Sequence, residues 1–93
     1  MVDGTGISVD FDGRLLVVEP TTRAAKEELG TSRLSLFITD ISRLSLKGAG
    51  MLRGGRLSLT MHDGSRHHLT FNRAQQPNFA HLYKELRAAK SIS

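Results

Sequence analysis

With 93 residues, 39% of them hydrophobic and none of them cysteine, the chain suits one small domain over residues 1–93 and excludes disulfides and thiolate metal sites. Thirteen Lys and Arg residues against nine Asp and Glu residues give a net charge of +4, which favours a polyanionic partner such as nucleic acid, an acidic membrane surface or an acidic protein. The apolar runs are too short to cross a membrane and the start of the chain lacks a signal-peptide pattern, so we expect a cytoplasmic protein with no transmembrane segment.

The first predicted element is a β-hairpin over residues 7–19. Apolar residues alternate with polar ones in its first strand, at Ile7, Val9 and Phe11. Asp12-Gly13 is typical of a tight turn, and a two-residue turn there pairs Val9 with Leu16. Residues 1–6 are small and polar, so we expect a loose lead-in before an ordered core of about residues 7–89.

The next segment, Thr21 to Thr31, has helix formers but almost no apolar stripe. Thr22 suits a helix N-cap and Gly30 suits a helix end, so we expect an exposed connection that is either partly helical or mobile. Alternation resumes after it and is interrupted by a bend at Thr39-Asp40. The inward residues on the two sides of this bend are predicted to be Leu34, Leu36, Ile38, Leu44 and Leu46.

A second hairpin, over Arg53 to Phe71, has its register fixed by the sequence. A two-residue turn at Asp63-Gly64 would place the apolar residues of its two strands on opposite faces. A three-residue loop with Gly64 in the left-handed conformation instead pairs Leu57 with Leu69. The same register pairs Leu59 with His67 and brings both apolar sets onto one face.

The chain is predicted to end in one amphipathic helix, which begins near Pro77. Its apolar residues recur at helical spacing, at Phe79, Leu82, Leu86 and Ala89. A flexible connection, Lys47 to Gly55, precedes the second hairpin and contains Gly48, Gly50, Gly54 and Gly55. Six or seven short strands followed by one C-terminal helix predict a mainly β fold, either a small antiparallel barrel or a bent sandwich capped by the helix.

This element order and several local motifs resemble bacterial pleckstrin-homology-like domains of unknown function, which are common in actinobacteria. The motifs are the Phe11-Asp12-Gly13 turn, the bend from Ile38 to Ile41 into Leu44 to Lys47, the glycines before Arg56 to Leu59, and the closing Phe71, Gln75-Gln76, Phe79, Leu82 and Leu86. The resemblance covers about residues 7–89. It implies a pleckstrin-homology-like fold and a role as a binding or scaffolding module.

A cluster of cations follows from the predicted strand register. If Leu46 pairs with Leu57, Lys47 lies opposite Arg56, and the other outward residues of the sheet are cations, serines and threonines. We define the basic face as the basic residues Arg43, Lys47, Arg56, Arg66 and His68. Like charges directly opposite cost up to ~1 kcal/mol unless an anion compensates them. Two interpretations stay open, an anion-binding site and the ordinary solvated face of an antiparallel sheet.

Catalytic and metal-binding motifs are missing from the sequence. His67 and His68 are adjacent on a strand and point to opposite faces, so they cannot chelate one ion together. There is no cysteine, no Gly-x-Ser-x-Gly nucleophile elbow and no paired carboxylates outside the exposed connection. We therefore expect no catalytic residue, no metal site and no cofactor, and a protein that is not an enzyme.

Three functions remain as hypotheses. The first is a non-enzymatic module that binds a protein segment, by strand addition at a sheet edge or in the groove beside the helix, or an anionic surface. The second is a basic small barrel that binds nucleic acid through the basic face. The third is an architectural protein that forms homo-oligomers through a strand edge. Phe37 is predicted to face outward, either beneath the Thr21 to Thr31 segment or in a contact between two copies.

Overall fold

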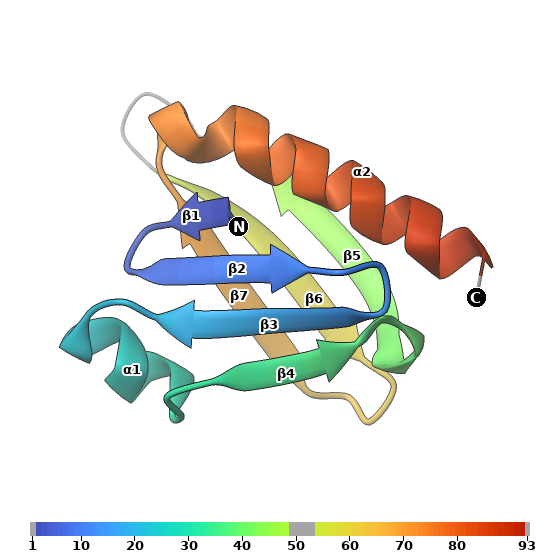
Figure 1. The fold of residues 1–93 in the computed structure, drawn as a ribbon, viewed down its shortest axis with the longest axis horizontal. Helices are drawn as coiled ribbons and strands as arrows, with labels where there is room; N and C mark the ends of the chain where they lie inside the picture. The colour runs from blue at the N-terminus through green and yellow to red at the C-terminus, as the bar shows by residue number, and fades with distance from the viewer. Residues whose placement is uncertain (1, 49–53, 93) are drawn as a thin grey trace.

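The computed structural model describes residues 2–48 and 54–92, and within them seven antiparallel strands form two sheets (Figure 1). The elements in chain order are β1 Val2–Gly4, β2 Ile7–Phe11, β3 Leu15–Pro20, α1 Arg23–Leu29, β4 Leu34–Phe37, the 3₁₀ turn η1 Ile38–Asp40, β5 Ile41–Lys47, β6 Gly55–Met61, β7 Arg66–Phe71, the 3₁₀ turn η2 Arg73–Gln75 and α2 Gln76–Ile92. The predictions made for Met1, Gly50 and Arg53 lie outside the described residues.

The two sheets form a bent sandwich. One sheet has the strand order β1-β2-β3-β4 and the other has the order β5-β6-β7. Figure 1 shows the strands of the second sheet crossing behind the first, with α2 along one end of both. At one corner the backbone N–H of Thr5 donates to the carbonyl of Thr70 at 2.9 Å, yet the two ladders do not close into a barrel. The prediction of a mainly β fold with one C-terminal helix is confirmed.

One core lies between the two sheets and α2. Phe71 of β7 and Phe79 of α2 are fully buried and stack with their ring centroids 4.6 Å apart. The buried apolar residues are Ile7, Val9, Leu16, Val18, Leu36, Ile38, Ile41, Leu57, Leu59, Met61, Leu69, Phe71, Phe79, Leu82 and Leu86. Burial of the predicted stripe on α2 explains why the helix forms, because an amphipathic helix is stabilised mainly by packing of its apolar face.

The β6–β7 hairpin has the predicted register. Leu57 pairs with Leu69, and the N–H of Met61 donates to the carbonyl of Ser65 at 2.8 Å. Gly64 has φ of 92°, in the left-handed region that favours glycine. The Asp63 carboxylate accepts from the backbone N–H of Ser65 at 2.8 Å and from its hydroxyl at 2.6 Å. The loop is therefore held by its own side chains.

The predicted two-residue turn between β2 and β3 is wrong. Val9 pairs with Val18 rather than with Leu16, because the loop is two residues longer. Asp12 explains the longer loop, since its carboxylate accepts from the N–H groups of Arg14 at 2.9 Å and Leu15 at 2.8 Å. A shift of two residues keeps the same side chains on the inner face, so the predicted core is unchanged.

The loose lead-in expected for residues 1–6 is also wrong. Val2–Gly4 forms β1 and pairs with β2, with Gly4 opposite Ile7. A Cβ on Gly4 would lie 2.9 Å from the Phe79 ring and 2.6 Å from the Thr70 carbonyl oxygen. This close packing, rather than an alternating apolar pattern, fixes the strand against the core.

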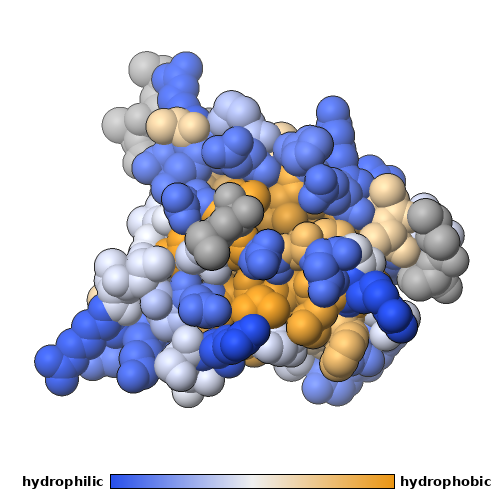
Figure 2. Space-filling model, viewed as in Figure 1, coloured by the Kyte–Doolittle hydropathy of each residue, from blue (hydrophilic) through white to orange (hydrophobic). Residues whose placement is uncertain are grey.

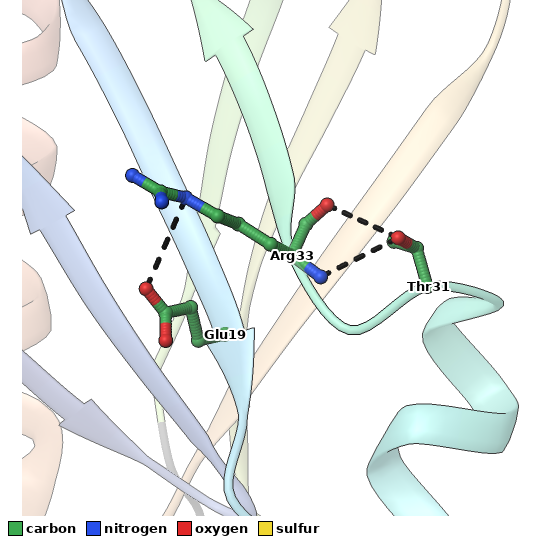
Figure 3. A network of polar contacts seen from close by, with 3 residues as sticks. All are labelled: Glu19, Thr31 and Arg33. Atoms are coloured by element: carbon green, nitrogen blue, oxygen red, sulfur yellow. Dashed lines mark hydrogen bonds and ion pairs between the residues drawn. The ribbon is translucent and has the colours of Figure 1, made fainter.

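The connection after β3 contains a two-turn helix, α1, with the predicted caps. Thr22 accepts from the N–H of Ala25 at 3.1 Å, and Gly30 ends the helix with φ of 79°. No residue of α1 is fully buried. After α1, the backbone N–H of Arg33 donates to the Thr31 hydroxyl at 3.4 Å. The Nε atom of the Arg33 side chain lies 3.9 Å from a carboxylate oxygen of Glu19 (Figure 3).

We predict that the Asp12 and Asp63 loops make the fold sensitive to acid. The N–H of Leu15 lowers the pKa of Asp12, and the Ser65 hydroxyl lowers the pKa of Asp63, both below the ordinary value of 3.8. A carboxyl whose pKa is lower in the folded than in the unfolded protein stabilises the fold above the unfolded value. That contribution is lost as pH falls through the folded pKa.

The double variant Asp12→Ala/Asp63→Ala tests this prediction. Its urea midpoint should fall at neutral pH and should change less than that of the original protein as the pH is lowered through about 4 toward about 2. If the urea midpoint of the double variant falls with pH as much as that of the original protein, other carboxylates cause the acid sensitivity. Asp3→Ala is a suitable control, because Asp3 is exposed on β1, outside both loops.

Candidate anion-binding face

The strand register places the basic face as predicted. Lys47 lies opposite Arg56, and Ser45 lies opposite Ser58 on β6. The ladder continues onto β7, where Thr60 pairs with Arg66. All five basic residues therefore lie on the outer face of the β5-β6-β7 sheet: Arg43, Lys47, Arg56, Arg66 and His68.

A β-bulge near the start of β5 lets Ile41 face the core although Arg43 faces outward. Ile41 pairs with Met61 and Arg43 pairs with Thr60, so Ser42 is an extra residue in the ladder. Ile41 is buried and Arg43 is exposed, although residues two apart in a regular strand share a face. Because Ser42 is the extra residue, Ile41 points to the core while Arg43 points to the outer face.

The three strands that carry the basic face supply no acidic residue to balance its positive charge. None of the residues of β5, β6 and β7 is Asp or Glu. The basic-face residues are exposed, and none of them makes an ion pair with a described residue. Elsewhere, the Nε atoms of two arginines lie near carboxylate oxygens, Arg33 at 3.9 Å from Glu19 and Arg23 at 3.9 Å from Glu27. The face therefore attracts anions more strongly than the surface around those two arginines.

A hydrogen bond holds His68 of the edge strand β7 on the basic face. Its Nδ1 lies 2.9 Å from the Ser58 hydroxyl, directly across the ladder. The hydroxyl donates to Nδ1 when that nitrogen carries no proton and accepts from it when it does, so the tautomer of the ring sets the direction of the bond. The predicted register places Ser58 opposite His68, but the sequence does not predict this hydrogen bond. His67 is half-buried opposite Leu59, which places the two adjacent histidines on opposite faces as expected.

Other surface features limit the chemistry of the described residues. Among them, no three His, Cys, Asp or Glu side chains gather where a metal ion could bind. His81 lies on α2, 3.0 Å from Glu85 and away from the basic face. None of the described helices combines the length and the apolar character needed to cross a membrane.

The four-stranded sheet presents a different outer face. Phe37 is 56% exposed and pairs with the partly exposed Leu15, so the α1 connection does not cover it. Figure 2 shows apolar surface over this sheet, bordered by hydrophilic residues. β4 is an edge strand of this sheet. Nothing described in the structure covers this patch.

Sequence reasoning missed a cavity beside β7. It has a volume of about 340 Å³ and lies between the edge of β7 and α1. The sequence carries no local signal for it, because residues 25–29 and 66–70 meet only in the folded chain. Its position next to Arg66 and His68 makes it continuous with the basic face.

Comparisons with protein-family models, curated proteins and solved structures find no match to this chain. The function is therefore inferred from the surface of the chain itself.

Proposed function

We propose that this chain is a non-catalytic binding module of the pleckstrin-homology-like type, whose basic face receives an acidic segment of a partner protein. The observation that carries the proposal is a face with four exposed Arg and Lys residues, one histidine and no carboxylate on its three strands. Arginine binds carboxylates through two parallel N–H donors, which suits an acidic segment.

The arrangement of cations favours a bound anion over a simply solvated face. Lys47 and Arg56 lie directly opposite each other, and such a like-charge pair costs roughly 0.2–1 kcal/mol. A carboxylate placed between the two side chains would offset that repulsion. The partner therefore contributes a charge that the chain itself does not supply on this face.

Nucleic acid is the second candidate, supported by the same positive charge. Proteins that bind single strands usually add aromatic side chains on which bases stack. The outer face of β5-β6-β7 carries no Phe, Tyr or Trp among its described residues. An acidic peptide does not need a stacking surface, so it fits the composition of the face better.

We predict that removing three arginines from the face weakens binding of poly-L-glutamate by about 10-fold. The variant is Arg43→Ser/Arg56→Ser/Arg66→Ser, and the estimate assigns about 0.5 kcal/mol to each exposed charge pair. Binding is measured from backbone amide shifts at low salt, about 50 mM, and at about 200 mM. The shifts should cluster on β5, β6 and β7.

The matched control is Arg14→Ser/Arg23→Ser/Arg33→Ser, which lowers the net charge from +4 to +1 just as the first variant does. It should retain most of the affinity, because these arginines lie outside the basic face. Equal losses in the two variants would mean that net charge alone drives binding and would overturn the proposal. Tighter binding of an oligothymidine strand, with a steep fall between the two salt concentrations, would favour nucleic acid instead.

A further inference from the structure

The outer edge of β7 has backbone groups that no other strand of the described residues uses. β7 is an edge strand, and the Met61–Ser65 bond shows that odd-numbered residues of β7 face β6 in the ladder. Even-numbered residues therefore direct N–H and C=O away from β6. The carbonyl of Thr70 confirms this direction, because it accepts from Thr5 at the sheet corner. Arg66 and His68 remain as edge residues without a partner strand among the described residues.

The cavity beside this edge lies between β7 and α1. Its wall opposite β7 is formed by Ala25, Glu28 and Leu29 of α1, and Thr5 and Ile7 close one side. Its volume of about 340 Å³ is within the usual range for ligand sites, roughly 300–1,000 Å³. The Thr5–Thr70 hydrogen bond occupies one end, so the open edge runs from Arg66 to His68.

The two sides of this edge differ in chemistry. Arg66 and His68 point to the basic face, whereas Ala25 and Leu29 pack against the core on the cavity side. Glu28 lines the cavity, so a carboxylate entering it would be repelled. An added strand has side chains that alternate between these two sides. Acidic side chains therefore belong on the outer side and small apolar ones in the cavity.

We infer that an extended peptide with alternating acidic and small apolar residues binds along β7 as a further strand of the β5-β6-β7 sheet. This inference rests on the proposed function and names its partner. Backbone hydrogen bonds to Arg66 and His68 hold the peptide, and its carboxylates contact the cations of the basic face. Neighbouring strands lie about 4.8 Å apart, so acidic side chains of the added strand reach the Arg66 and His68 side chains.

The test is amide hydrogen exchange on the full chain with a capped peptide of about six residues in which Asp and Val alternate. Binding should slow exchange of the Arg66 and His68 amides by about 10-fold or more, because both gain acceptors. The ladder amides of His67 and Leu69 should be protected with or without the peptide. A peptide of the same sequence with alternate backbone nitrogens methylated should lose most of its affinity.

A pair of variants separates the backbone from the side chain. His68→Pro and His68→Ala both remove the imidazole, but only proline removes the N–H that points to the open edge, where proline is tolerated. Peptide affinity should fall at least about 5-fold further in His68→Pro than in His68→Ala. If His68→Pro does not fold, the methylated peptide against the original chain decides the same question.

The outcomes separate this inference from the proposed function. Shifts on the basic face without slowed exchange at Arg66 and His68 would overturn strand addition and leave the basic face as the site. Slowed exchange along the edge of β5 instead would also overturn it. Peptide binding that is unchanged in Arg43→Ser/Arg56→Ser/Arg66→Ser would overturn the proposed function.

Discussion

Phe79→Ala is expected to lower the free energy of unfolding by about 3–5 kcal/mol. The ring is fully buried and stacks on Phe71 with centroids 4.6 Å apart. It also fills the space that a Cβ on Gly4 would occupy, so it joins α2 to both sheets. A domain of this size has a total stability of only about 5–15 kcal/mol, so urea unfolding should show a large loss or an unfolded protein.

Phe37→Ala is the matched control, because it makes the same truncation on the other side of the molecule. Phe37 is 56% exposed on β4 and fills no part of the core. Its replacement should cost less than about 1 kcal/mol. Similar losses for the two variants would show that α2 contributes little to stability and would contradict the packing described above.

The sequence predicted a strand register where the apolar alternation of two paired strands had to fall on the same face. In the β6–β7 hairpin, a two-residue loop would place the apolar side chains of the two strands on opposite faces. A three-residue loop brings Leu57 and Leu59 onto the same face as Leu69 and Phe71. In the β2–β3 hairpin, the two-residue turn and the observed longer loop place the same residues inward. Alternation could not choose between them, and the hydrogen bonds of Asp12 did.

The basic face could be predicted because it depends only on strand pairing. The leucines of β5 and β6 fixed which residues faced inward, and the cations followed from alternation. The bulge at Ser42 does not disturb this result, since Arg43 was placed by counting from Leu44 and Leu46. The bulge itself was not predicted, because it reflects how Ile41 reaches the core.

Features that depend on close approach between distant segments were not predicted. β1 exists because Gly4 allows Phe79 and Thr70 to approach, and the edge cavity exists because α1 lies beside β7. Neither contact has a period or a motif in the sequence. The candidate site is therefore half predictable, because the strand register predicts its basic residues whereas the cavity beside β7 exists only in the folded chain.

Gly55→Ala is expected to destabilise the protein by about 3 kcal/mol, although it adds only one methyl group. Gly55 is buried at the start of β6, opposite Phe71. A Cβ there would overlap the Phe71 ring and lie 2.7 Å from the Lys47 carbonyl oxygen. The ring cannot move aside easily, because Phe79 stacks on it. Urea unfolding measures the loss.

Gly48→Ala provides the control, since the nearest atom to its added Cβ is the Gln76 side-chain nitrogen at 3.4 Å, an ordinary contact with a side chain. Its stability should stay within about 0.5 kcal/mol of the original protein. Because Gly55 lies between Phe71 and the Lys47 backbone, its substitution should also move the pair formed by Lys47 and Arg56 and weaken poly-L-glutamate binding. Equal stability of Gly55→Ala and Gly48→Ala would mean that the Phe71 ring has room to shift, and would contradict the tight packing that positions this end of the basic face.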